Sequence, residues 1–132
     1  MIAGESALEV AGRLLIVGYF LVTGVSNLTR ARIEDHVARM VAAGLPLARP
    51  AFWLGIALQL TGCTLLATGW RPDLGAACLI VFTVAATAIF HRFWRLQDPL
   101  ARNFSRLMLL NNTGLLGGLL LLFAHTSQGG TP

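Results

Sequence analysis

The stretch 106-RLMLLNNTGLLGGLLLLFA-124 carries no charge after Arg106. As an α-helix, residues 107–124 would extend about 27 Å, close to the roughly 30 Å thickness of the hydrocarbon core of a bilayer. We therefore expect a transmembrane helix here. Asn111 interrupts the apolar run, and Gly114 and Gly118 follow it on the same helical face. The pattern predicts that this face packs against another helix.

The composition of the whole chain agrees with a membrane location. Of its 132 residues, 55% are hydrophobic and only 12% are charged, whereas soluble domains carry about twice that charged fraction. The length fits a single transmembrane domain, residues 1–132. All the basic residues are arginines placed between apolar runs, a pattern typical of topology signals and lipid phosphate contacts. We predict the lipid bilayer as a partner and no nucleic acid.

Three further apolar runs precede the opening stretch, so the predicted spans are residues 8–28, 51–69, 74–92 and 107–124. The longest connection, residues 29–49, repeats apolar residues at helical spacing and ends with Gly44 and Pro46. This pattern predicts a short amphipathic helix along the membrane surface. The predicted fold class is all-α: an integral membrane antiparallel four-helix bundle with a short interfacial helix between the first and second spans.

The second predicted span repeats the combination of polar and small residues. Gly55, Gln59 and Gly62 share one helical face. Small residues and cross-helix hydrogen bonds hold helices together in lipid. We therefore expect Gln59 and Asn111 to face the bundle interior as intramembrane polar packing residues, with Gly114 and Gly118 at helix contacts.

The arginines also predict the topology. The middle connection holds Arg71 alone, whereas the first and third connections are rich in arginine: Arg30, Arg32, Arg39, Arg49, Arg92, Arg95, Arg102 and Arg106. The positive-inside rule places these two connections in the cytoplasm and both termini outside. Arg13, near the start of the first span, is interpreted as an interfacial anchor that snorkels to the headgroups, with a role as a site residue as the alternative.

Metal and cofactor signals are weak. Cys63 and Cys78 both fall inside apolar runs without a C-x-x-C spacing, so neither a disulfide framework nor a structural zinc site is predicted. His36, His91 and His125 lie at or beyond the ends of the spans, which argues against a haem held between helices. We predict no metal, no catalytic residue and no resident cofactor, with a quinone as the one cofactor kept open.

Several motifs together resemble the DoxX family of small bacterial four-helix membrane proteins. They are Arg13, Phe20 and Gly24; Ala43-Gly44-Leu45-Pro46; Gly62 and Gly69; Phe90-His91-Arg92-Phe93-Trp94; and Asn111 with the run at residues 114–121. The resemblance implies a compact antiparallel bundle in the bacterial cytoplasmic (inner) membrane. It also implies a link to quinone-linked sulfur oxidation or to membrane complexes that respond to oxidative or thiol stress. Gln59 stands where many relatives have Glu, and an amide cannot take up a proton.

Three functions are compatible with these observations. The first is a non-catalytic accessory or structural subunit of a larger membrane complex (redox or energy-converting), in contact with other membrane protein subunits. The second is a quinone-interacting, redox-associated protein, in which His91, Arg92 and Trp94 contact a quinone or a lipid headgroup. The third is a small-solute transporter, which ranks last because the spans contain no acidic residue beyond Glu9 at the very start of the first one, and no broken-helix pair. No nucleophile–base pair is visible, so catalytic activity of the chain on its own is not expected.

Overall fold

The computed structural model describes residues 6–90 and 96–129. They form five α-helices, α1 (Ala7–Ser26), α2 (Arg30–Ala42), α3 (Ala48–Thr68), α4 (Pro72–Phe90) and α5 (Pro99–Gly129). All but α2 contain a stretch long and apolar enough to cross a membrane. The prediction of an all-α fold, with four spans and a short helix between the first two, is therefore confirmed.

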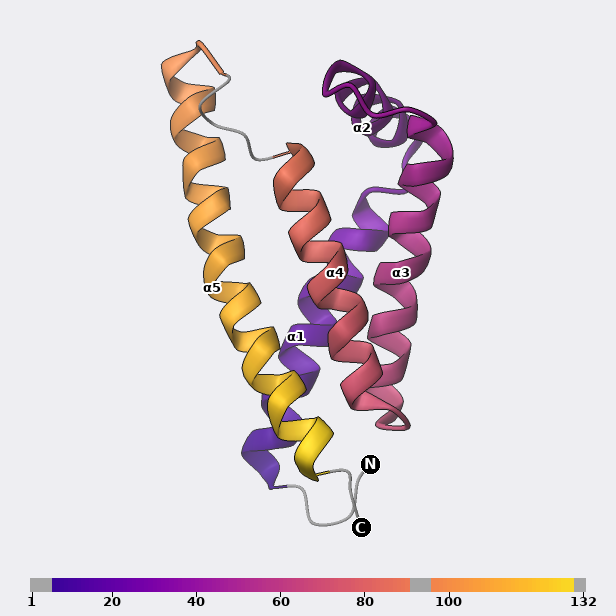
Figure 1. Cartoon of the computed structure of the whole chain (residues 1–132), viewed down its shortest axis with the longest axis vertical. Helices are drawn as coiled ribbons and strands as arrows, with labels where there is room; N and C mark the ends of the chain where they lie inside the picture. Colours follow the sequence, from indigo (N-terminus) through magenta and orange to yellow (C-terminus); the bar gives the residue numbers. More distant parts are fainter. Residues whose placement is uncertain (1–5, 91–95, 130–132) are drawn as a thin grey trace.

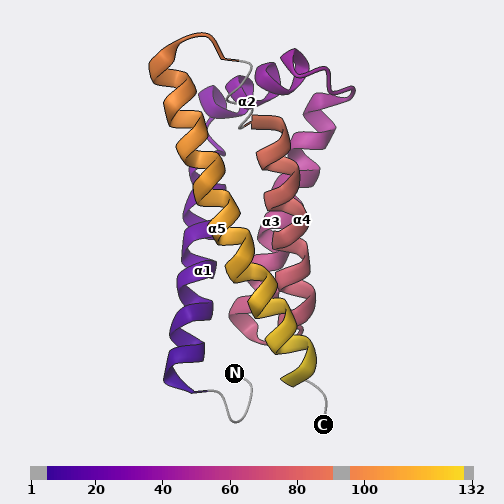
Figure 2. The same ribbon diagram turned by 60° about the vertical axis from the view of Figure 1, so that its left-hand side comes forward.

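The four long helices alternate in direction, so the beginning of α1 and the end of α5 lie at the same end of the bundle (Figure 1). α3 packs between α1 and α4, and α5 packs against α4. The short helix α2 lies across the opposite end, where α1 ends and α3 begins (Figure 2). We call this the α2 end of the bundle; α5 also begins there.

Local sequence signals set the helix ends. Ser6 and Glu9 form a capping box at the start of α1, with each side chain bonded to the other's backbone N–H at 3.1 Å. Gly69 ends α3 in the left-handed region, with φ of 72°, which glycine adopts without the strain of a Cβ. These caps explain why α1 and α3 begin and end within a few residues of the predicted spans.

α5 begins earlier than expected, at Pro99 rather than at residue 107. Pro99 suits a first helical position because its missing N–H would have no intrahelical partner. The preceding Asp98 accepts a hydrogen bond from the Ala101 N–H through Oδ2 at 3.0 Å, as a helix N-cap does. Hydropathy marked only the apolar part of the helix, whereas the cap and the proline set its true start.

Two buried clusters hold the helices together. The larger one lies among the four long helices and consists of Val17, Phe20, Cys63, Leu66, Leu79 and Leu119. The smaller one lies under α2 and consists of Met40, Ala48, Phe52 and Ile56. In the second cluster, Met40 of α2 packs against residues of α3, so α2 is part of the packed bundle.

Candidate functional site

Gln59 lies in the contact between α3 and α1. Its side chain is only 1% exposed. Nε2 donates to the backbone oxygen of Phe20 at 2.7 Å and to the hydroxyl of Thr23 at 3.2 Å. Gly24 makes room for the amide, because a Cβ there would lie 3.0 Å from Gln59 Nε2. The geometry is that of an interhelical hydrogen bond, which joins the two helices across their buried contact.

Asn111 does not share this interior position. It is exposed on the outer surface of α5, and the adjacent Asn112 is the asparagine that contacts another helix. Asn112 donates through Nδ2 to the hydroxyl of Thr87 on α4 at 3.0 Å. Neighbouring residues on a helix are turned by about 100°, so only one of two consecutive asparagines can face α4. The prediction that Asn111 faces the interior was therefore wrong.

Gly114 and Gly118 share the outward face with Asn111. Both are exposed, and a Cβ built at either position would meet no atom within 4 Å. Their predicted place at helix contacts within the chain was also wrong. The inward face of α5 instead carries Leu119, which is fully buried, and the half-buried Leu115 and Leu122. These leucines lie three, seven and ten residues after Asn112, a helical spacing that marked the inward face.

Arg13 is another correction to the sequence interpretation. Its side chain is 2% exposed, so it is buried in the bundle and does not extend to the headgroups as an interfacial anchor. Arg13 is buried because it lies on the same face of α1 as the buried residues Val17, Phe20 and Gly24. One turn earlier, the Glu9 carboxylate lies 3.3 Å from His125 Nε2, linking α1 to the last turns of α5.

At the α2 end, His36 and Arg39 of α2 meet the last residue of α4. The Arg39 guanidinium lies 5.1 Å from the centre of the Phe90 ring, and its Nη2 donates to the Phe90 backbone oxygen at 3.3 Å. The His36 ring lies 5.2 Å from the Phe90 ring and 5.8 Å from that of Phe52. This cluster joins three helices directly before residue 91. The proposed quinone or headgroup contacts His91, Arg92 and Trp94 lie outside the described residues.

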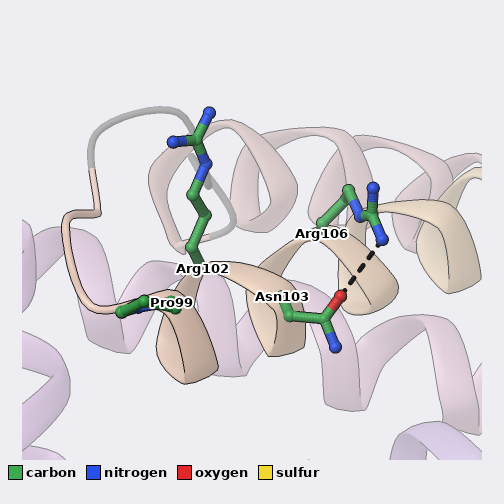
Figure 3. Close-up of a pocket in the computed structure, with 4 residues that line it drawn as sticks. All are labelled: Pro99, Arg102, Asn103 and Arg106. Carbon is green, nitrogen blue, oxygen red and sulfur yellow. Dashed lines mark hydrogen bonds between the residues drawn. The ribbon is translucent and has the colours of Figure 1, made fainter.

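A surface hollow of about 390 Å³ lies at the start of α5, lined by Pro99, Arg102, Asn103 and Arg106 (Figure 3). The Arg106 guanidinium donates through Nη2 to Asn103 Oδ1 at 3.1 Å. The sequence pattern predicted these arginines as topology signals and lipid phosphate contacts, without a site formed by particular residues. Because the last helix was expected to begin at residue 107, Arg102 and Arg106 were not placed one helical turn apart.

The described residues contain no group of three or more His, Cys, Asp or Glu side chains arranged to hold a metal ion. The predicted lack of a catalytic residue and of a resident cofactor stays a prediction. Within residues 6–90 and 96–129, the polar groups that the fold brings together include the Gln59 contact, the His36–Arg39–Phe90 cluster, the Asn112–Thr87 pair, the Glu9–His125 pair, the Arg49–Glu34 pair and the hollow at α5.

Comparison with known proteins supports the family seen in the motifs. The model of one protein family, described as DoxX, matches residues 8–92, which include α1 from its second residue onward and all of α2, α3 and α4. The resembling residues of α5, Asn111 and 114–121, lie beyond the matched range. Neither the comparison with curated proteins nor that with solved structures found a match. The matched residues make up more than half of the chain, and the protein belongs to the DoxX family of integral membrane proteins.

Proposed function

We propose that this protein is a non-catalytic accessory subunit of a larger membrane complex and that α5 makes the contact with its partner. The observation that carries the proposal is the outward face of α5, where Asn111, Gly114 and Gly118 are exposed. Of the candidate spans, α5 is also the least covered by the chain itself: 11% of its apolar window is buried, against 33% for α3.

An exposed amide is unfavourable in hydrocarbon, because lipid offers it no hydrogen-bond partner. Glycines on the same face remove side-chain bulk, so another helix can approach the backbone closely. Asn111, Gly114 and Gly118 follow one another at spacings of three and four, with the exposed Leu107 and Leu121 continuing the stripe at either end. A transmembrane helix of a second protein would satisfy the amide and cover these glycines. Lipid chains would leave the amide unsatisfied.

Co-purification tests this proposal directly. The tagged protein, extracted in a mild detergent and measured by native mass spectrometry, should carry at least one different membrane protein. The variant G114L/G118L should lose that partner without losing its own fold, because the added side chains meet no atom of the chain within 4 Å of the Cβ. Gly12 on α1 is also exposed with open space around it, so Gly12→Leu is the matched control and should keep the partner.

Two results would count against the accessory role: a lone monomer after mild extraction, and a species that contains two copies of this chain and nothing else. The second result would assign the α5 face to self-association. A partner retained by G114L/G118L would contradict α5 as the contact.

The quinone-associated alternative remains a proposal tied to His91, Arg92 and Trp94. It is favoured by the neighbouring described residues, because His36, Arg39 and Phe90 bring aromatic rings and a cation next to residue 91. Aromatic side chains can stack on a quinone ring, and His and Arg can donate hydrogen bonds to its carbonyl oxygens. His91→Ala and Trp94→Ala should each weaken the binding of a short-chain quinone analogue, measured by quenching of tryptophan fluorescence or by calorimetry. Unchanged binding in both variants would eliminate this alternative.

A further inference from the structure

The first two turns of α5 extend beyond the apolar part of the helix at the α2 end. The helix begins at Pro99, whereas the uncharged run begins after Arg106. Eight helical residues cover about 12 Å, and a headgroup layer is roughly 5–8 Å thick on each side of the hydrocarbon core. When the uncharged run fills the hydrocarbon core, Arg102, Asn103 and Arg106 lie at the depth of lipid phosphates.

These turns combine a polar hollow with exposed apolar side chains. The hollow of about 390 Å³ is lined by Arg102, Asn103 and Arg106 together with Pro99 (Figure 3). Leu100 and Phe104, on the same two turns, are 78% and 65% exposed. A free phosphate ion would use the cationic groups alone. A phospholipid uses both features, because its phosphate meets the arginines while its acyl chains contact the apolar side chains.

The charges around the hollow favour an anion. Asp98 is the one acidic residue between residues 91 and 106, and its Oδ2 caps the helix by accepting the Ala101 N–H. Arg49 and Arg39, at the same end of the bundle, lie beside carboxylates: Arg49 Nη2 is 2.9 Å from Glu34 Oε1, and Arg39 Nη1 is 4.0 Å from Asp35 Oδ2. Arg106 instead donates to an uncharged oxygen, Asn103 Oδ1, which orients the guanidinium and leaves its positive charge uncompensated by this contact.

We propose that Arg102, Asn103 and Arg106 form a binding site for the phosphate of an anionic phospholipid headgroup. Guanidinium groups present N–H donors in a planar fork that matches two phosphate oxygens. The Asn103 Oδ1 holds Arg106, so the Asn103 Nδ2 remains as a third donor for the lipid. The site is a property of the chain itself and does not depend on the accessory role.

Native mass spectrometry of the protein in mild detergent tests the proposal, with phosphatidylglycerol and phosphatidylcholine as probes. The wild-type protein should retain one phosphatidylglycerol and bind phosphatidylcholine at least tenfold more weakly. At about 1 kcal/mol per basic residue near a lipid surface, R102Q/R106Q should weaken phosphatidylglycerol binding by about 30-fold. The matched control R30Q/R32Q removes the same charge from α2 at the same end and should change binding less than threefold.

If R30Q/R32Q weakened phosphatidylglycerol binding as much as R102Q/R106Q, the lipid would be attracted by the overall positive charge and not by a site. Unchanged phosphatidylglycerol binding in R102Q/R106Q would also overturn the proposal. Inorganic phosphate, added alone at millimolar concentration, should not displace the lipid; displacement would assign the hollow to a free anion. Asn103→Leu keeps every charge and removes one donor, so it should weaken phosphatidylglycerol binding about fivefold even where the double variant proves unstable. Undiminished binding by Asn103→Leu would contradict the assigned donor role.

Discussion

Gly62 of α3 and Gly75 of α4 lie back to back, and a Cβ on either would come within 3.0 Å of the other's backbone oxygen. A Cβ on Gly62 would also approach Leu79 Cγ at 2.8 Å. The two helices therefore approach each other more closely than a side chain at either position would allow. Between helices in lipid, such contact replaces the hydrophobic effect as the source of association, because lipid tails are as apolar as leucine.

Gly62→Ala should therefore destabilise the bundle by about 1–3 kcal/mol, the usual cost of inserting extra atoms into a packed interior. Gly12→Ala is the matched control, since a Cβ there meets no atom within 4 Å. Alanine in an exposed helix interior is worth up to about 1 kcal/mol more than glycine, so the control should be neutral or stabilised. Thermal unfolding in detergent, followed by far-ultraviolet circular dichroism, measures both. Equal stability of the two variants would contradict the close contact between α3 and α4.

Gln59→Met should cost about 1 kcal/mol of unfolding free energy. Methionine nearly keeps the length of the side chain but removes the Nε2 donor that bonds the Phe20 oxygen at 2.7 Å and the Thr23 hydroxyl at 3.2 Å. Interhelical hydrogen bonds in membranes contribute about 0.6 kcal/mol on average and at most about 1.7 kcal/mol. Thr64→Val, which alters an exposed hydroxyl bonded within its own helix, is the control. If Gln59→Met and the wild-type protein unfolded at the same temperature, the stabilising role assigned to the Gln59 amide would be contradicted.

The existence and order of the helices could be predicted well, because a long apolar run with few charges forms a membrane-spanning helix far more often than any other structure. Helix orientation was predicted less well. Hydropathy alone cannot show which face of α5 meets α4, because nearly all the side chains in its apolar run are apolar. Asn111 was therefore predicted to face the interior, whereas Asn112 is the residue that bonds Thr87. Arg13 was placed in the headgroups from its charge and depth. Its phase with Val17 and Phe20, which buries it, was readable in the sequence.

Met40 is the residue whose loss should most affect α2. It is the buried residue of α2 and lies in a cluster with Ala48, Phe52 and Ile56 of α3. Removing a buried methionine side chain costs about 2–5 kcal/mol, and 2 kcal/mol corresponds to a factor of about 30 in an equilibrium. Met40→Ala should accelerate amide hydrogen exchange in residues 30–42 by at least that factor while the long helices stay protected. Val41 is exposed, so Val41→Ala should leave exchange unchanged. Uniformly faster exchange across all helices would show that α2 unfolds only with the whole bundle.

Both ends of the chain are expected on the outer side of the membrane, with the α2 end in the cytoplasm. α2 and the start of α5 carry Arg30, Arg32, Arg39, Arg102 and Arg106, whereas the turn between α3 and α4 carries Arg71 alone. Arginine in short connections opposes translocation, so the richer end stays inside. Alkaline phosphatase fused after Pro132 or Trp70 should be active, and after Gly44 inactive. Green fluorescent protein at the same three positions should give the reverse pattern, because it fluoresces only when folded in the cytoplasm. Fluorescence from the Pro132 fusion together with an inactive phosphatase there would invert the assigned orientation.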